Sequence, residues 1–280
     1  MTDLFPSGTL DDMRLTVSHD FVWLLHRNRL DSFESWYDES LVGAPIRHTG
    51  DRANLRLAIE CQGEKRLVLY LKRHEPMTFW RKLAFRLKLR RPVTPARAEW
   101  ANTYLVASLG VATSYPVALG EDPATGRSFL VTAEIEGAKP ADDFARERFA
   151  SHAPDAARNR RHLVRRIGEM ARRLHAARQA HRDLYLCHVF VKESGGDYQM
   201  HLIDLQRLGR FRLPRWRVKD AAQLEFSRPE GVFTRTDGVR FLRAYFGVRR
   251  LEPKHKRFAR AVLRKAAAIR RRERAKDATR

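Results

Sequence analysis

Alternation of hydrophobic and polar positions is clearest between residues 53 and 72. In the segment ANLRLAIEC, residues 53–61, every second residue is apolar, as on the buried face of a strand. The residues on that face are Leu55, Leu57, Ile59 and Cys61. Residues 62–64 have the composition of a turn, and the apolar segment RLVLYLK follows them. The pattern predicts a β-hairpin that ends near Lys72.

A helical period replaces the alternation in the segment ARAEWANTYLVASL, residues 96–109. Thr94 is a good N-cap, Pro95 is a good first helical residue, and Gly110 stands where a helix would end. These signals predict a helix near 95–109, with Glu99 in its first turns.

Two further apolar segments, YPVALGE and SFLVTAEI, read as strands separated by a turn at residues 122–126. The chain up to about residue 137 therefore predicts a small β-rich lobe that contains one helix.

The second half of the chain is mainly helical in pattern. Residues 160–177 carry one apolar stripe, as expected of a helix that covers a core. The stripe comprises Leu163, Val164, Ile167, Met170, Ala171 and Leu174. The segments HVFVKE and YQMHLIDL, with Gly195 and Gly196 between them, predict a second hairpin that ends at Asp204. Beyond Arg215 the pattern is again helical and very basic.

Four charged residues follow one another at the ends of these predicted elements. Lys72 ends a strand, Glu99 lies early in a helix, Asp183 lies in the segment HRD, and Asp204 follows the second hairpin. Transfer of a phosphoryl group from ATP needs a cation on the phosphates, an acid that holds it, a carboxylate beside the attacking hydroxyl, and a metal-binding carboxylate. The four residues fill these roles in order.

The pattern departs from that of protein kinases at several places. Those enzymes carry a metal-binding asparagine five positions after the HRD aspartate, where this chain has His188. A neutral imidazole is a weak ligand for Mg²⁺, which prefers oxygen. No glycine-rich nucleotide motif occurs, so the segment RHTGDRANL is at most a minimal phosphate-covering turn with Gly50 as its flexible point. The short segment between Asp204 and Asp220 lacks A-P-E, which favours an acceptor other than a peptide.

Several segments together resemble the lipopolysaccharide core kinases, which include heptose kinases and 3-deoxy-manno-octulosonic acid kinases. The segments are YLKRH, RAEW…LGV, SFLVTAEI, HRDLYLCHVFVKE, LIDLQRLGR and RWRVKD, and the resemblance covers about residues 45–245. It implies an α+β, two-lobed protein-kinase-like fold with a β-rich N-lobe at residues 1–137 and a larger, mainly helical C-lobe at residues 138–280. It also implies a kinase that uses ATP and Mg²⁺ to phosphorylate a sugar hydroxyl, with heptose as the expected sugar, on the lipopolysaccharide inner core.

The resemblance further implies the role of each charged residue. Lys72 steadies the nucleotide phosphates, Glu99 orients Lys72, Asp183 in the loop 181–188 is the catalytic base, and Asp204 binds the metal ion. Many family members read DLHR after the hairpin, where this chain has Gln206, and this departure leaves the metal-binding carboxylate in place.

Other residues in and near the loop have further candidate roles. The family itself carries histidine at the position of His188, which makes this residue a second candidate metal ligand. Arg182 either positions a substrate phosphate or braces the loop, and both readings stay open. We expect His181 to support the loop backbone, and Asp220 to be a candidate for hydrogen bonds to the loop from behind.

The composition of the chain indicates the kind of partner it binds and its cellular compartment. The 280 residues include 55 Lys and Arg against 33 Asp and Glu, and the formal net charge of +22 favours polyanionic partners. Cys61 and Cys187 are the two cysteines, so we expect ordinary buried thiols and a reducing compartment. The acidic N-terminus lacks the order of a signal peptide, and no apolar run is long enough to span a bilayer. We therefore expect a cytoplasmic protein, peripheral on the inner face of the inner membrane.

Two basic segments bear on membrane binding. The segment FWRKLAFRLKLRR, residues 79–91, gathers most of its apolar residues within one arc of a helical wheel. It predicts either an interfacial helix or a helix packed on the N-lobe. The basic tail, residues 257–280, would be attracted to an anionic membrane surface.

Two other functions compete with the lipopolysaccharide kinase. The same fold could phosphorylate another sugar or an aminoglycoside-like small molecule. A catalytically inactive, kinase-like protein that binds nucleic acid or a membrane would also suit the charge. The sequence has no recognised nucleic-acid-binding motif, however, and the carboxylates would then have no task. The sequence gives no indication of an oligomeric state.

Overall fold

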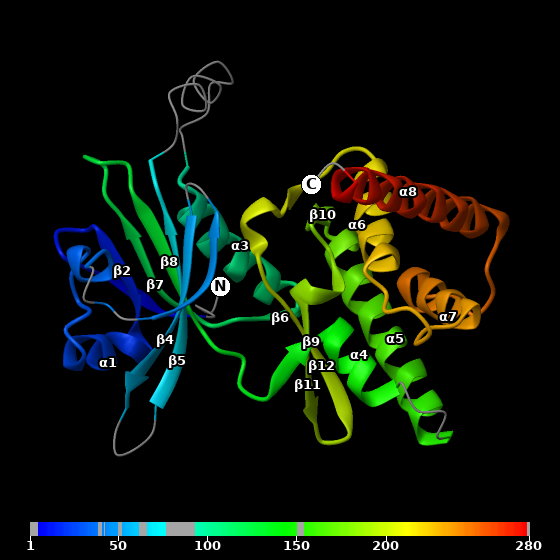
Figure 1. Ribbon diagram of the computed structural model, residues 1–280, viewed down its shortest axis with the longest axis horizontal. Coiled ribbons are helices and arrows are strands. Elements are labelled where there is room, and N and C mark those ends of the chain that lie inside the picture. The colour runs from blue at the N-terminus through cyan, green and yellow to red at the C-terminus, as the bar shows by residue number, and fades with distance from the viewer. Residues whose placement is uncertain are drawn as a thin grey trace. The chain divides into compact units, whose positions relative to one another are not determined.

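The computed structural model describes residues 5–38, 41, 43–49, 52–61, 66–76, 93–149 and 154–278. The chain is a mixed α/β protein that divides into two compact units (Figure 1). The first unit comprises Met1–Leu105 and Ser114–Ile135, and the second comprises Val106–Thr113 and Glu136–Arg280. Each unit is described by itself.

The first unit is built on a seven-stranded antiparallel sheet with the strand order β1-β2-β7-β8-β5-β4-β3. The strands are β1 (Ser7–Leu10), β2 (Leu15–Ser18), β3 (Ala44–Thr49), β4 (Arg52–Glu60), β5 (Arg66–His74), β7 (Pro116–Glu121) and β8 (Ser128–Ala133). The predicted hairpin is confirmed as β4 and β5, which pair along their whole length. β5 runs two residues past Lys72, because its edge pairs with β8 as far as His74.

The alternating residues of β4 and β5 face the core of the first unit. Leu57, Leu69 and Leu71 are almost completely buried there. The N-terminal segment, for which the sequence predicted no elements, contributes the fully buried Trp36 to the same core. This segment contains β1, β2, η1 (His19–Phe21), α1 (Val22–Arg27) and η2 (Glu34–Trp36).

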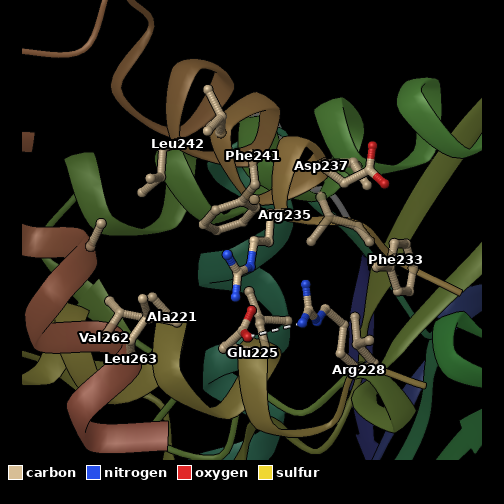
Figure 2. A pocket seen from close by; sticks show the side chains of 17 residues that line it. Ala221, Glu225, Arg228, Phe233, Arg235, Asp237, Phe241, Leu242, Val262 and Leu263 are labelled. Carbon is tan, nitrogen blue, oxygen red and sulfur yellow. Dashed lines mark ion pairs between the residues drawn. The ribbon is translucent and has the colours of Figure 1, made fainter. Parts of the chain in front are cut away.

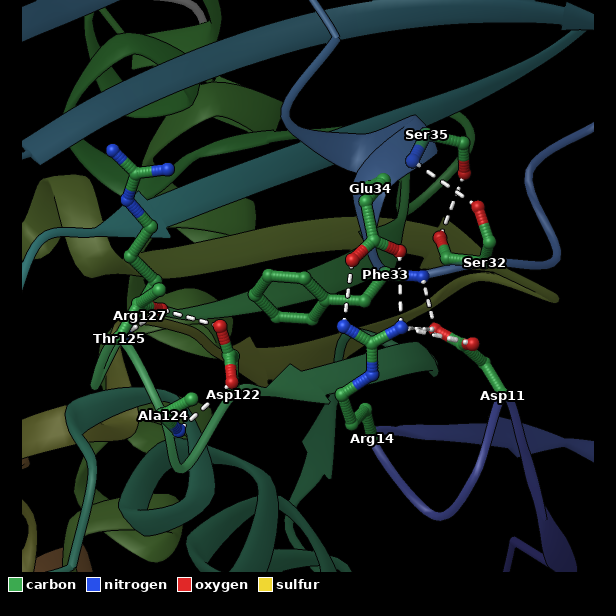
Figure 3. Close-up of polar contacts among 10 residues, drawn as sticks. All are labelled: Asp11, Arg14, Ser32, Phe33, Glu34, Ser35, Asp122, Ala124, Thr125 and Arg127. Carbon is green, nitrogen blue, oxygen red and sulfur yellow. Dashed lines mark hydrogen bonds and ion pairs between the residues drawn. The ribbon is translucent and has the colours of Figure 1, made fainter.

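Arg14 ties the N-terminal elements of this unit together (Figure 3). Its guanidinium donates to Glu34 Oε1 at 2.6 Å and to both carboxylate oxygens of Asp11 at 3.1 Å. Asp11 Oδ2 also accepts a hydrogen bond from the backbone nitrogen of Phe33 at 2.7 Å. One carboxylate therefore fixes both a guanidinium and the start of η2.

The predicted turn between β7 and β8 is closed by Asp122, as Figure 3 also shows. Its carboxylate accepts hydrogen bonds from the backbone nitrogen of Ala124 at 2.9 Å and from the hydroxyl of Thr125 at 2.6 Å. The hydroxyl bond is the main reason that the pKa of Asp122 lies below its ordinary value. The aspartate of this turn thus supplies local hydrogen bonds that the sequence pattern anticipates.

The predicted helix is α3 (Pro95–Ser108). Thr94 Oγ1 accepts from the backbone nitrogen of Arg97 at 3.1 Å, which confirms the predicted N-cap. Ala96 and Trp100 pack against Leu119 and Leu130 of the sheet. Gly110 follows the helix with φ of 69°, a conformation that glycine adopts without strain.

Among its described residues, the second unit combines five α-helices with two small sheets. One sheet has the order β6-β12-β11-β9, and the other pairs β10 with β13. The strands are β6 (Ala112–Thr113), β9 (Ala138–Pro140), β10 (Gln179–Ala180), β11 (Val189–Ser194), β12 (Asp197–Leu202) and β13 (Gly209–Arg210). The helices are α4 (Ala141–Phe149), α5 (Pro154–Ala176), α6 (Arg215–Phe226), α7 (Arg235–Phe246) and α8 (Pro253–Asp277), with the 3-10 turns η3 (Leu186–His188) and η4 (Leu205–Arg207).

The apolar stripe predicted within residues 160–177 lies on α5, and all six of its residues are buried. α5 packs closely against α7, and Gly168 permits this approach. A Cβ atom at Gly168 would lie 2.9 Å from the Cβ atom of Ala244 and from the carbonyl oxygen of Phe241. Small residues likewise bring α6 and α8 together, where Ala222 packs in one cluster with Ala266.

The second predicted hairpin is confirmed as β11 and β12, which pair from Val189–Leu202 to Ser194–Asp197. Gly195 and Gly196 form its turn, with φ of 57° and 78°. The hairpin carries the chain from the HRD segment to Asp204, whose own φ of 57° marks a sharp change of direction before η4.

One expectation is wrong: Cys187 is exposed and Cys61 is only half-buried, so they are not two buried thiols. Cys187 is exposed because it lies in η3 at the surface of the loop rather than in the hairpin behind it. The turn around Gly50 and the segment 79–91 lie outside the described residues. In the part of the chain that the structure describes, no helix is long and apolar enough to cross a membrane.

Candidate active site

A buried ion pair joins β5 to α3 in the first unit. Lys72 Nζ lies 2.6 Å from Glu99 Oε1, and the side chains are 20% and 5% exposed. Burying two charges costs several kcal/mol before their attraction offsets it, so such a pair is weak evidence for stability. It does fix the direction of a long, flexible lysine, which is the relationship that the sequence order predicted.

The HRD segment lies in the second unit, between β10 and η3. His181 is completely buried, and its Nε2 donates to the carbonyl oxygen of Ile203 at 2.9 Å. Burial lowers the pKa of His181, which keeps the ring neutral. His181 therefore supports the backbone that leads to Asp204, as the sequence led us to expect.

Asp220 of α6 holds the segment from behind. It is completely buried, and its two oxygens accept hydrogen bonds from the backbone nitrogens of His181 at 2.7 Å and Arg182 at 2.8 Å. Arg182 has φ of 71°, which is unfavourable for a residue with a Cβ atom. The carboxylate stabilises this conformation, and the contact anticipated for Asp220 is confirmed.

Two more residues on the same face of α6, and Ser227 directly after it, also bind the loop, and no sequence motif marked them. Lys219 Nζ donates to the carbonyl oxygen of Arg182. Gln223 Oε1 accepts from the backbone nitrogen of Leu184 at 3.1 Å, and Ser227 Oγ, just beyond the helix, accepts from that of Leu186 at 2.9 Å. Their spacing with Asp220 is helical, and polar residues at this spacing within and after RWRVKD were the available signal.

Lys219, Asp220, Gln223 and Ser227 together form a clamp on the loop that contains Asp183. Asp183 Oδ2 accepts from Arg207 Nη1 at 2.8 Å, and its Oδ1 lies 3.9 Å from Lys219 Nζ and 3.5 Å from Gln223 Nε2. The side chain is 20% exposed, so one edge of the carboxylate reaches solvent. The segment thus holds an acidic group between two cations, with its backbone fixed on the opposite side.

The side chain of Arg182 packs on Trp216 of α6. Its guanidinium lies over the ring of Trp216, 4.8 Å from the ring centroid. This cation–π contact and the clamp on its backbone favour the bracing role over contact with a substrate.

His188 connects the loop to Asp204. Its Nδ1 donates to the carbonyl oxygen of Asp183 at 2.8 Å, and its Nε2 lies 3.9 Å from Asp204 Oδ2. Burial lowers the pKa of His188, but hydrogen bonds with Cys187 and the Asp183 carbonyl, together with the charge of Asp204, outweigh it and raise the pKa to about 9. The ring is therefore positively charged near neutral pH and attracts the Asp204 carboxylate.

Comparison with known proteins shows the family to which a chain with this site belongs. The model of the lipopolysaccharide kinase (Kdo/WaaP) family matches residues 39–245, which include the HRD loop, α6 and Asp204. The chain belongs to this family.

Individual relatives agree with the family match. The lipopolysaccharide core heptose(I) kinase WaaP of Pseudomonas aeruginosa is 35% identical over 244 residues, which are 84% of this chain and 87% of the relative. The enzyme of the same name from Escherichia coli is 35% identical over 217 residues, 74% of this chain and 79% of the relative. A solved structure described as WaaP in complex with acyl carrier protein matches with a TM-score of 0.68 and 32% identity, and covers 92% of this chain and 99% of that one.

The resemblance inferred from the sequence is therefore confirmed. The chain is an ATP-dependent kinase of the lipopolysaccharide core. Of the residues that the sequence singled out, Lys72 and Glu99 meet in the first unit, while Asp183, His188 and Asp204 are linked in the second.

The donor atoms suit a metal ion that arrives with its nucleotide. The described residues contain no group of three or more His, Cys, Asp or Glu side chains that could hold a metal ion by themselves. Mg²⁺ in ATP-dependent enzymes is bound by one or two carboxylates, with phosphates and water as its other ligands. Asp204, 30% exposed, is a carboxylate of that kind, whereas a charged His188 would first have to lose a proton.

A large apolar cavity lies elsewhere in the second unit, between α5, α6, α7 and α8 (Figure 2). Its volume is about 630 Å³. Leu242, Val262 and Leu263 line it, and Glu225 pairs with Arg228 at 3.2 Å on one side. Burial raises the pKa of Glu225 above its ordinary value. No sequence pattern predicted the cavity, because its lining comes from four separate helices and from residues between them, such as Leu186 and Phe233.

Proposed function

We propose that this protein transfers the γ-phosphoryl group of ATP to a heptose hydroxyl of the lipopolysaccharide inner core. The relatives named heptose(I) kinase support the acceptor, since they share about a third of their residues with most of this chain. The observation that carries the proposal is the clamp of α6 on the HRD loop. It fixes the backbone on both sides of Asp183 and leaves that carboxylate partly exposed.

Asp183 is the proposed catalytic base. An acceptor hydroxyl that donates to Oδ2 would take the place now occupied by the guanidinium of Arg207, a side chain that is 63% exposed. Proton transfer from the hydroxyl to Asp183 accompanies its attack on the phosphoryl group. Oδ1 would stay beside Gln223 Nε2, at 3.5 Å, and Lys219 Nζ, at 3.9 Å.

The nucleotide would be bound by the other predicted residues. Lys72, oriented by Glu99, is the proposed ligand of its phosphates, and Gly50 is proposed to cover them. Asp204 is the proposed ligand of Mg²⁺, with His188 as a further candidate. When bound, Mg²⁺ supplies positive charge that offsets the charge of the phosphates.

The proposed architecture is that of a two-lobed, protein-kinase-like enzyme, with a nucleotide-binding N-lobe at residues 1–137 and a catalytic C-lobe at residues 138–280. The proposed location is peripheral, on the inner face of the inner membrane. Exposed cations along α8 support attraction to an anionic surface. They are Lys254, Lys256, Arg257, Arg260, Arg264, Arg271, Arg272, Arg274 and Lys276.

The proposal is tested by incubating the purified protein with ATP and unphosphorylated core oligosaccharide, and measuring ADP formation. We expect ADP to form only when the oligosaccharide is present, and Asp183→Asn to lose several orders of magnitude in kcat. An aminoglycoside that supports faster turnover than the oligosaccharide would favour the small-molecule kinase instead. Turnover of Asp183→Asn at the wild-type rate would contradict the mechanism.

A binding partner is also proposed: an acyl carrier protein. The solved relative in complex with such a protein supports it, and so does the apolar cavity between α5, α6, α7 and α8, since these carriers present a fatty acyl chain. Calorimetric titration should show tighter binding of acylated than of unacylated carrier protein. Leu242→Arg, within the cavity, should abolish that difference, and Leu213→Gln, an exposed residue before α6, should preserve it. Equal affinity for the two forms of the carrier would exclude the cavity as the acyl site.

A further inference from the structure

We propose that Lys219 is a catalytic residue whose ammonium group binds the phosphoryl group during its transfer to the acceptor. The proposal rests on the function proposed above, because it places the reacting phosphorus next to Asp183. In that mechanism Lys219 contacts only the carbonyl oxygen of Arg182 and the carboxylate of Asp183, and no residue of the second unit is assigned to the phosphoryl group during its transfer.

The position of Lys219 is fixed by three contacts within the second unit. Its Nζ donates to the carbonyl oxygen of Arg182, lies 3.9 Å from Asp183 Oδ1, and lies 5.7 Å from the centroid of the Trp216 ring. The side chain is 26% exposed. An ammonium group has three donors, and among the described residues the structure gives this one a single hydrogen-bond acceptor. Donors therefore remain for a ligand beside Asp183.

The separation from Asp183 is informative. An ion pair formed for stability closes to hydrogen-bond distance, as Arg207 does at 2.8 Å on the other oxygen. Lys219 stops 3.9 Å from its carboxylate, although burying an ammonium group carries a desolvation cost. A partly buried cation held at this distance is suited to a third group that contacts both side chains.

Other cations near the loop are less suited to this task. The residues between Asp183 and His188 are Leu184, Tyr185, Leu186 and Cys187, so the loop itself supplies none there. Arg182 lies over Trp216, and His188 donates to the loop carbonyl and faces Asp204. Arg207 is 63% exposed, whereas Lys219 is held from a helix. Lys219 is therefore the fixed cation at the base.

The chemistry places negative charge where Lys219 can reach it. The acceptor oxygen forms a bond to the γ-phosphorus, the bond from that phosphorus to the bridging oxygen breaks, and ADP leaves with the electron pair. The hydroxyl proton passes to Asp183. Because the attacking oxygen is hydrogen-bonded to Asp183, the three outer phosphoryl oxygens lie within a few ångströms of that carboxylate. A positioned cation is most effective there, where charge is spread over those oxygens.

The charge of Lys219 responds to its surroundings. Burial lowers its pKa, and the cations Arg207 and Lys265 act in the same direction, while Asp183 and Asp220 oppose them. Turnover should therefore fall at alkaline pH, below the ordinary lysine pKa of 10.5, as the ammonium group loses its proton.

The test uses the full-length protein and three variants: Lys219→Met, Lys219→Arg and the control Lys139→Met. Lys139 lies on β9 and pairs with Glu147. We expect Lys219→Met to lower kcat about 10²- to 10³-fold while the KM for ATP changes less than about threefold. Lys219→Arg should recover part of kcat and move the alkaline decline to higher pH, because a guanidinium stays charged. Lys139→Met should match the wild type.

A binding measurement separates this role from support of the loop. Mg²⁺ and ADP with aluminium fluoride imitate the phosphoryl group in transfer, so their affinity in the presence of core oligosaccharide is compared with that of Mg²⁺ and ADP alone. Lys219→Met should bind Mg²⁺ and ADP with aluminium fluoride at least about tenfold more weakly than wild type. Its affinity for Mg²⁺ and ADP alone should be unchanged. Loss of a residue that only braced the loop would weaken both affinities or neither.

The outcomes distinguish this assignment from the proposed function. An active wild type together with Lys219→Met turnover within about threefold of it would overturn the role of Lys219 alone. Equal loss of both affinities would do the same. A wild type that transfers no phosphate to the core would overturn the proposed function and this assignment with it. The catalytic role of Lys219 is supported if Lys219→Met selectively loses kcat and affinity for the aluminium fluoride complex, and if Lys219→Arg recovers part of both.

Discussion

Glu99 holds the ammonium group of Lys72 at 2.6 Å from the neighbouring helix, and only 5% of the glutamate side chain is exposed. A lysine at the end of a strand has four rotatable bonds, and this carboxylate limits it to one direction. The pair connects residues far apart in the chain, and both lie within the first unit. The effect of this ion pair on turnover can be measured directly.

Replacing Glu99 with glutamine should separate orientation from binding. Without the charge, Lys72 loses its fixed direction, and we expect kcat/KM for ATP to fall at least about tenfold, which is about 1.4 kcal/mol. Steady-state kinetics at varied ATP concentrations would measure this. Glu136→Gln changes an exposed glutamate after β8 and serves as the control. Equal kcat/KM values in Glu99→Gln and wild type would show that the pair does not serve catalysis.

Replacing Asp220 with asparagine should affect both stability and turnover. The amide retains one acceptor oxygen, so one of the backbone nitrogens of His181 and Arg182 loses its partner inside the protein. An unpaired buried donor costs about 1–3 kcal/mol in the free energy of unfolding. Urea unfolding and kcat should both show the change. Asparagine that left stability and kcat intact would contradict the clamp.

Asp237 makes stability depend on acid pH. Burial raises its pKa, but hydrogen bonds from Thr234 and the charges of Arg160 and Arg240 outweigh burial, and the pKa lies below the ordinary 3.8. Because the folded state favours the carboxylate, this stabilisation is fully present above that ordinary value and is lost as pH falls through the folded pKa.

The corresponding variant is Asp237→Asn, which removes the charge from the capping box that Thr234 and Asp237 form at the start of α7. We expect it to lower the free energy of unfolding by about 1–3 kcal/mol at neutral pH. The difference from wild type should shrink as pH is lowered below 3.8. Urea unfolding at a series of pH values measures both, with Asp143→Asn, an exposed aspartate on α4, as the control. A constant difference across that range would show that the charge of Asp237 does not contribute.

The elements that the sequence predicted correctly are those fixed by local patterns. α3 has its N-cap at Thr94, β4 and β5 alternate cleanly, and α5 carries a regular apolar stripe. The N-terminal strands were missed because each has only four residues, and Leu15 becomes buried only through pairing of β2 with β7, about a hundred residues later.

The residues of the site divide in the same way, into those marked by local patterns and those defined by contacts between distant segments. Lys72, Glu99, Asp183 and Asp204 were singled out because they stand at the ends of predicted elements in the order that phosphoryl transfer requires, and Asp220 because it ends the segment RWRVKD. Lys219, Gln223 and Ser227 were missed because their partners are backbone groups about forty residues earlier in the chain. The helical spacing marks a shared face of α6, but a short-range pattern does not show which backbone groups that face contacts.

The central claim is that Asp183 promotes transfer of phosphate from ATP to a heptose hydroxyl of the core. Mass spectrometry of core oligosaccharide after incubation with ATP and protein tests it most directly. We predict one added phosphate, carried by heptose, with wild type and essentially none with Asp183→Asn. Phosphate on another sugar, or equal phosphorylation by Asp183→Asn, would contradict the account.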